Sequence, residues 1–186
     1  MTAANPLYLL PVLLLLAVAA VIDFRQRRIP NWLTGALALS GLIQSLTPLH
    51  SCTITASLLG LLAGFALMFG QFAVGGLGGG DVKLLMGVGT WVGPLPLLLI
   101  FAATSVIGLM IVLTQAAWQG RLRLLFRNSA LVAVNLAHLK QVGLEHMTAT
   151  GQSCRSISRP LPYAVPVLIA TVLVALSPWL CGGFLK

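Results

Sequence analysis

Two aspartates are the residues of this chain best suited to chemistry. Asp23 and Asp81 are two of only three acidic residues among 186, the third being Glu145. Two carboxylates brought close together in a poorly hydrated site do not both ionise easily, so such a pair holds one proton. The ionised member can take a proton from water while the protonated member donates to a peptide carbonyl or a leaving amine. Paired in this way, the two aspartates predict peptide hydrolysis that needs no metal ion and no covalent intermediate.

Glycines precede Asp81 at positions 75, 76, 78, 79 and 80. Because glycine lacks a Cβ, it accepts positive φ and close approach of another backbone. We expect a loop here, with positive φ at Gly80, whose open edge receives an unwound substrate segment. A simpler alternative is that Asp81 only caps the helix that follows it, and that Asp23 only neutralises nearby arginines.

Motifs for other chemistries are missing from the sequence. The chain has no G-x-x-x-x-G-K-[ST] phosphate loop, no H-E-x-x-H zinc motif and no G-x-S-x-G nucleophile elbow. Its three cysteines are widely separated and form no CxxC pair. We therefore expect no cofactor and no metal site.

The composition is that of a membrane protein. Hydrophobic residues make up 58% of the chain and charged residues 8%, and the mean hydropathy is +0.99. A soluble domain has about 25% charged residues, so soluble, disordered and fibrous classes are excluded. A nucleic-acid-binding protein is excluded as well, despite the net charge of +8. The sequence predicts an all-α polytopic bundle in which residues 1–186 form a single domain.

Apolar runs long enough to cross or enter a bilayer define about six expected transmembrane helices with the N-terminus outside. They cover residues 6–22, 32–49, 54–74, 82–93, 95–118 and 161–184. This topology places ten of the eleven Lys and Arg residues in the cytoplasm, as the positive-inside rule requires. It also puts Asp23 and Asp81 at the same depth on the cytoplasmic side. The basic segment of about 119–160 is expected on the cytoplasmic membrane surface, against anionic lipid headgroups.

Small residues recur one helical turn apart in the third run. Ala56, Gly60 and Gly64 would let another helix backbone approach closely. Packing within the bundle is the favoured explanation and dimerisation the alternative. The sequence predicts no particular oligomeric state.

Three motifs give the chain a family resemblance. The segment DFRQRRIPNWLT begins at Asp23, GGGDVK ends at Lys83, and RPLPYAVPV begins at Arg159. In this order they resemble the motifs of the type IV prepilin peptidases: an aspartate followed by basic residues and I-P-N, then G-x-G-D-x-K, then R-x-x-P-Y-x-x-P. Together they frame almost the whole chain.

The resemblance implies an aspartic-type, GxGD-containing endopeptidase of the bacterial inner membrane. Such an enzyme removes the basic leader from prepilin or pseudopilin precursors on the cytoplasmic side, after a glycine. Asp23 and Asp81 match its catalytic pair, with no metal between them. The supporting residues of the matched motifs are Arg28, Pro30, Asn31, Gly78, Gly80, Lys83, Pro162 and Tyr163.

The chain departs from the larger members of that family. Those members carry a cytosolic domain after the first span, often with CxxC pairs, which is linked to N-methylation of the new pilin terminus. Here about eight residues separate the first two spans, so methyltransferase activity is not expected. The short form resembles the peptidases of tight-adherence (Flp) pilus systems, and archaeal preflagellin peptidases share its compact plan.

Two other functions remain open from the sequence. One is a noncatalytic membrane subunit or transporter component that uses Asp23 and Asp81 as a proton or cation relay. The other is a broader GxGD protease that cuts ordinary membrane helices. Relay carboxylates usually lie near the bilayer midplane, and the broader proteases typically have Tyr before the first aspartate, where this chain has Ile22.

Overall fold

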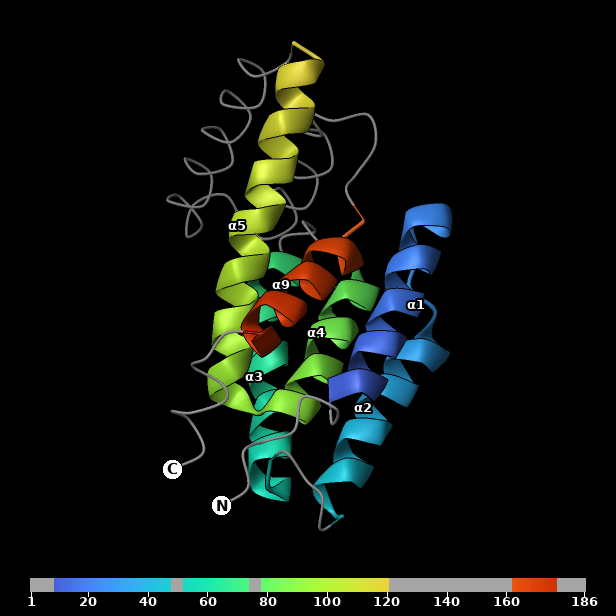
Figure 1. Ribbon diagram of the computed structural model, residues 1–186, viewed down its shortest axis with the longest axis vertical. Coiled ribbons are helices and arrows are strands. Elements are labelled where there is room, and N and C mark those ends of the chain that lie inside the picture. The colour runs from blue at the N-terminus through green and yellow to red at the C-terminus, as the bar shows by residue number, and fades with distance from the viewer. Residues whose placement is uncertain (1–8, 48–51, 74–77, 121–161, 177–186) are drawn as a thin grey trace.

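The computed structural model describes residues 9–47, 52–73, 78–120 and 162–176. These residues form six α-helices and no strand, in agreement with the predicted all-α class (Figure 1). The segment 119–160, apart from its first two residues, lies outside the described ranges, as do Glu145 and the glycines at 75 and 76. The helices are α1 (Leu10–Gln26), α2 (Asn31–Ser45), α3 (Ile54–Ala73), α4 (Gly79–Val92), α5 (Pro94–Trp118) and α9 (Ala164–Leu176).

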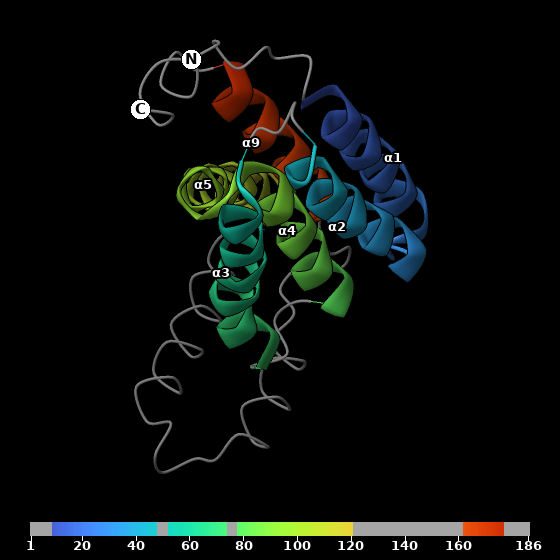
Figure 2. The same ribbon diagram turned by 90° about the horizontal axis from the view of Figure 1, so that it is seen from below.

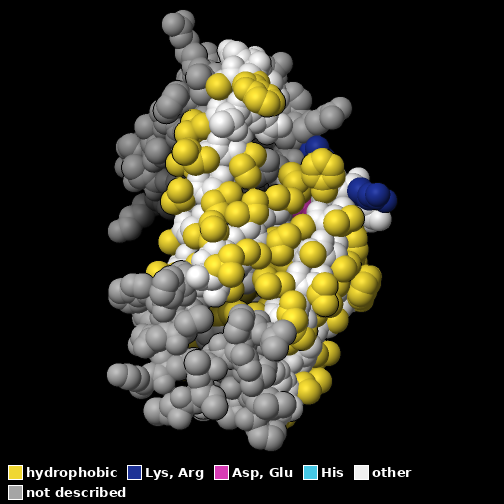
Figure 3. Space-filling model, in the orientation of Figure 1, with side chains coloured by type: hydrophobic (Ala, Val, Ile, Leu, Met, Phe, Trp, Pro, Cys, Tyr) yellow, Lys and Arg dark blue, Asp and Glu magenta, His cyan; other side chains and the backbone are white. Residues whose placement is uncertain are grey.

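Two of these helices are long and apolar enough to cross a membrane. They are α3 and α5, with mean hydropathies of 1.7 and 2.6, and α9 is a shorter apolar helix. Large apolar side chains on both are exposed, among them Phe65, Phe69, Leu109 and Met110. Figure 3 shows such side chains over most of the described surface that it displays. Exposed apolar surface of this extent is typical of a lipid or protein contact, so these helices are compatible with a membrane protein.

Helix α4 lies at the centre of one group of helices. It packs most extensively against α3 and next against α2, and Figure 2 shows it between those two helices. Helix α9 packs against α1 and α5 and forms a second group. The two predicted catalytic residues are divided between the groups, since Asp23 lies in α1 and Asp81 in α4.

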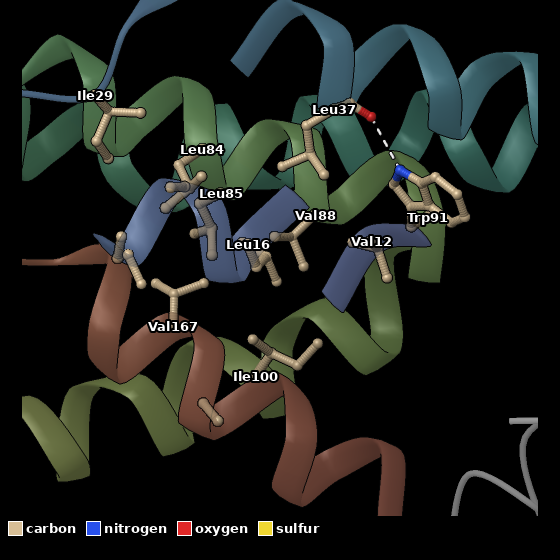
Figure 4. Close-up of a cluster of buried hydrophobic side chains, with 14 of the residues drawn as sticks. Val12, Leu16, Ile29, Leu37, Leu84, Leu85, Val88, Trp91, Ile100 and Val167 are labelled. Carbon is tan, nitrogen blue, oxygen red and sulfur yellow. Dashed lines mark hydrogen bonds between the residues drawn. The ribbon is translucent and has the colours of Figure 1, made fainter. Parts of the chain in front are cut away.

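The buried core is formed where these groups meet. Leu84, Leu85 and Val88 of α4 are fully buried, and they are surrounded by buried side chains of α1, α2, α5 and α9 (Figure 4). Burying each of these large apolar side chains contributes roughly 1.5–3 kcal/mol relative to full exposure in water. This core fixes α4 relative to α1 and α9, and so it also fixes the distance between the two aspartates.

Helices α3 and α4 touch through their backbones. A Cβ at Gly60 would collide with the backbone of Gly89, and a Cβ at Gly89 would collide with that of Gly60. A Cβ at Gly64 would lie 2.9 Å from the Cα of Met86. The small-residue spacing predicted in the third run is therefore confirmed as packing within the bundle.

The helix boundaries differ from the predicted runs at three described ends: α1 continues to Gln26 although its run was expected to end at residue 22, α2 already ends at Ser45 where 49 was expected, and α4 begins early. The fourth run was expected to begin at residue 82, but the helix already begins at Gly79. Between α4 and α5 the only non-helical residue is Gly93, whose φ of 79° suits glycine. Pro94 then begins α5, where its missing N–H costs nothing.

Candidate active site

Asp23 lies in the last turn of α1 and is 5% exposed. Its Oδ2 accepts a hydrogen bond of 3.1 Å from the backbone N–H of Ala164, the first residue of α9. The backbone N–H of Tyr163 also donates to this carboxylate. The first N–H groups of a helix have no partner within the helix, and here Asp23 supplies one from a distant part of the chain.

Asp81 lies in the first turn of α4 and is partly buried. Its Oδ2 accepts a hydrogen bond of 3.2 Å from the backbone N–H of Gly78, which precedes the helix. The capping role considered for Asp81 is therefore present. It does not account for the environment of the residue, because the charge of Asp23 also acts on it.

The two carboxylates lie outside the apolar runs, and the charge of Asp23 acts on Asp81. Burial raises the pKa of Asp81 to about 6; the Gly78 N–H opposes this and the negative charge of Asp23 adds to it. Burial also raises the pKa of Asp23, opposed by the Ala164 and Tyr163 N–H groups and by the charge of Arg27. The structure thus brings Asp23 and Asp81 within electrostatic range of each other.

Tyr163 connects the surroundings of both aspartates. Its backbone N–H donates to Asp23, and its side chain lies within electrostatic range of Asp81. The side chain is half-buried and packs against the hydrophobic core. Pro162, also half-buried, precedes it directly. The third motif therefore contributes to the site through its Pro-Tyr-Ala segment, which the sequence had placed only near the start of the last span.

The expected positive φ at Gly80 is wrong. Gly79 and Gly80 are helical, and Gly78 has φ −78° and ψ 149°. Close packing, and not backbone conformation, favours glycine at position 80. A Cβ there would lie 3.3 Å from the Cβ of Ile29 and 3.4 Å from its carbonyl oxygen.

The remaining motif residues lie around the two aspartates. Lys83 Nζ donates a hydrogen bond of 2.9 Å to Asn31 Oδ1, which joins the first and second motifs at an exposed position. Pro30 precedes α2 as its N-cap, and Arg28 is exposed in the α1–α2 connection. Within the described part of the chain, neither Arg28 nor Lys83 makes an ion pair with Asp23 or Asp81.

Two contributors to the site were missed from the sequence: Ala164 and Ile29. Ala164 donates to Asp23, and Ile29 packs against Gly80. Both lie inside the quoted motifs, so the motif segments were the available signal. Arg27, one of the arginines expected near Asp23, has φ 54° and ends α1 with its charge close to that carboxylate. Nothing in the sequence indicated which atom of each residue is used.

A protein metal site needs several ligands held close together. Within the described ranges, no group of three or more His, Cys, Asp or Glu side chains lies close enough to hold a metal ion. The site itself presents two carboxylates, each of which accepts a backbone N–H at the N-terminal end of a helix.

Comparison with known proteins gives one match. A family model described as the type IV leader peptidase family matches residues 10–113, more than half of the chain. The matched range contains both aspartates and ends before α9. No curated protein and no solved structure matched.

Proposed function

The chain belongs to the type IV leader peptidase family, and we propose that Asp23 and Asp81 are its catalytic pair. The family supports prepilin leader peptidase activity in general. The proposal adds that the enzyme is an aspartic-type endopeptidase. The observation that carries it is the electrostatic coupling of two partly or fully buried carboxylates from separate helices.

The reaction uses one proton shared by the pair. Water attacks the carbonyl carbon of the scissile peptide bond and gives one proton to the ionised carboxylate, while the other carboxyl gives its proton to the carbonyl oxygen. When this intermediate collapses, the C–N bond breaks and the first carboxyl protonates the leaving amine. The second carboxylate takes back a proton from one hydroxyl group of the intermediate, whose oxygen becomes the carbonyl oxygen of the new acid. The products are an acid and an amine, and the pair returns to its starting state.

The substrate proposed is a prepilin or pseudopilin precursor, with the basic leader removed after a glycine. The short connection between α1 and α2, with no CxxC pair in the chain, favours the Flp type and peptidase activity without N-methylation. The motif match supports the same substrate class, because its three segments contribute residues to one site.

The proposed location is the bacterial inner membrane, with residues 1–186 as one multi-pass domain of six spans. The N-terminus lies outside and both aspartates face the cytoplasm. The distribution of Lys and Arg supports this orientation. Exposed aromatic side chains beside the basic connection, Phe24 and Trp32, suit the interface with lipid headgroups.

Co-expression with a panel of candidate prepilins tests this function. The wild-type chain is compared with Asp23→Asn and Asp81→Asn at matched membrane levels, and the pilin terminus is read by mass spectrometry. We expect cleavage after a glycine, an unmethylated terminus, and no cleavage by either variant. Failure of the wild type on the whole panel would overturn the prepilin assignment and favour the relay function.

A further inference from the structure

The two aspartates are held differently, although each accepts backbone N–H groups at the start of a helix, α9 for Asp23 and α4 for Asp81. Asp23 is 5% exposed and receives backbone N–H groups from both Ala164 and Tyr163. Asp81 is more exposed and receives one N–H, that of Gly78, at 3.2 Å. Hydrogen bonds donated to a carboxylate favour its ionised form, and two favour it more than one.

The charges around the two carboxylates also favour the ionised form of Asp23 over that of Asp81. Arg27, on the same helix, places a positive charge close to Asp23. The titratable groups near Asp23 from other parts of the chain are Asp81 of α4 and Tyr163, which precedes α9. Neither of them carries a positive charge. Within the described residues, Asp81 receives no such cationic contribution, while it does experience the negative charge of Asp23.

We propose that the backbone N–H groups at the beginning of α9 give the two aspartates different roles. Asp23 is the ionised carboxylate that takes the proton from water, and Asp81 carries the proton that is donated to the substrate. This inference rests on the proposed peptidase function and deepens it. The backbone N–H groups of Tyr163 and Ala164 act as positioning groups, since they touch Asp23 and not the substrate. The water proton then goes to Asp23, and the carbonyl oxygen receives the proton of Asp81.

The order of ionisation is measurable without substrate. The chain has three acidic side chains, so Glu145→Gln leaves Asp23 and Asp81 as the only side-chain carboxyls. An infrared titration of this purified variant follows the band of the protonated carboxyl groups as the pH is raised. The band is lost in two steps, and the pH at the middle of each step is called the lower and the upper midpoint. In a coupled pair the midpoints belong to the pair, and perturbing one carboxylate at a time identifies which residue dominates each.

The perturbation removes single N–H donors. Replacing the peptide N–H of Ala164 by an ester oxygen deletes one donor to Asp23 with little change in shape. We expect the lower midpoint to rise by about one pH unit and the upper to stay. The same replacement at Gly78 deletes the donor to Asp81, and there the upper midpoint should rise by about one pH unit instead.

Two controls separate this effect from general damage. An ester at Val165, in the same turn of α9, removes an N–H that does not bond Asp23 within the described structure, and both midpoints should stay. As a purely genetic variant, Arg27→Gln should raise the lower midpoint by less than the Ala164 ester does. The neighbouring exposed Arg28→Gln should leave it unchanged, which makes it the matched control.

The inference is overturned if the Ala164 ester raises the upper midpoint, or if it moves both midpoints equally. A rise in the lower midpoint alone supports it. Because the titration needs no substrate, its outcome is independent of the cleavage experiment. If the chain cleaves no prepilin, the proposed function is wrong. If the order of ionisation is reversed, only the roles assigned to Asp23 and Asp81 are wrong.

Discussion

The two ends of α4 are both rich in glycine and polar groups, yet they serve different purposes. At the far end, Thr90 donates to the carbonyl of Gly87, its own carbonyl accepts from Ser57, and Trp91 Nε1 donates to the carbonyl of Leu37 at 2.9 Å. At the near end, Asp81 is held by one N–H and faces a second carboxylate. Neutral, matched polar groups stabilise the far end, whereas the near end places two carboxyl groups close together, an arrangement that is typical of functional sites.

The glycines at the two ends also differ. Gly89 is in contact with the backbone of α3, which leaves no room for any side chain. Gly80 faces the side chain and carbonyl of Ile29 at distances that are tight without being impossible. The comparison therefore predicts that changes at the far end affect folding, and that changes at the near end affect activity first.

The largest expected effect on folding comes from Gly89→Ala. Its Cβ would collide with the backbone of Gly60, so α3 and α4 must separate, at a cost of about 3 kcal/mol. Thermal unfolding in detergent measures this loss. Gly70→Ala on α3 is the control, since no atom lies within 4 Å of its Cβ position. Equal stability of the two variants would contradict the described contact.

Asp81→Asn is expected to remove activity and to change how stability depends on pH. Since the pKa of Asp81 is about 6 in the folded chain against an ordinary 3.8, the native state binds more protons between these values. Wild-type stability should therefore fall as pH rises from about 4 to 6, by up to about 3 kcal/mol from this group. The Asp81→Asn variant should lack this part of the fall in stability. Parallel unfolding curves across this pH range would show that the carboxyl is not perturbed.

Gly80→Val should lower the cleavage rate about tenfold while the protein stays folded, because a displaced catalytic group is costly. The new side chain would push the first turn of α4 away from Ile29 and move Asp81 with it. Gly79→Val is the matched control, because its Cβ would meet only Phe72, at 3.7 Å. Full activity of Gly80→Val, measured as initial cleavage rate, would show that this contact does not position Asp81.

The smallest expected effect is at Lys83. Its bond to Asn31 is exposed, and exposed polar pairs contribute less than about 1 kcal/mol. A double-mutant cycle with Lys83→Met and Asn31→Ala should therefore give a coupling of about 0.5 kcal/mol in unfolding free energy. A loss of cleavage as large as that of the aspartate variants would instead place Lys83 among the catalytic groups.

The sequence predicted the all-α class of fold and the proximity of Asp23 and Asp81, because apolar run length indicates helices and the chain has few other acidic residues. The catalytic role of the two aspartates stays a prediction. It also predicted the close approach along Gly60 and Gly64, because helical spacing determines which residues share a face. It did not predict the bond between Asp23 and Ala164, since this contact depends on how α1 and α9 pack. The error at Gly80 has a related cause: glycine suits both positive φ and close packing, and only the position of Ile29 distinguishes them.

The central claim is that Asp23 and Asp81 act as one catalytic unit. It is tested most directly by prepilin cleavage rates of purified Asp23→Asn, Asp81→Asn and the double variant, with Glu145→Gln as the matched acid-to-amide control. We predict that each single variant loses at least about 10³-fold, that the double variant loses no more than either one, and that the control keeps its activity. Substantial activity in either single variant, or losses that multiply in the double variant, would contradict the claim.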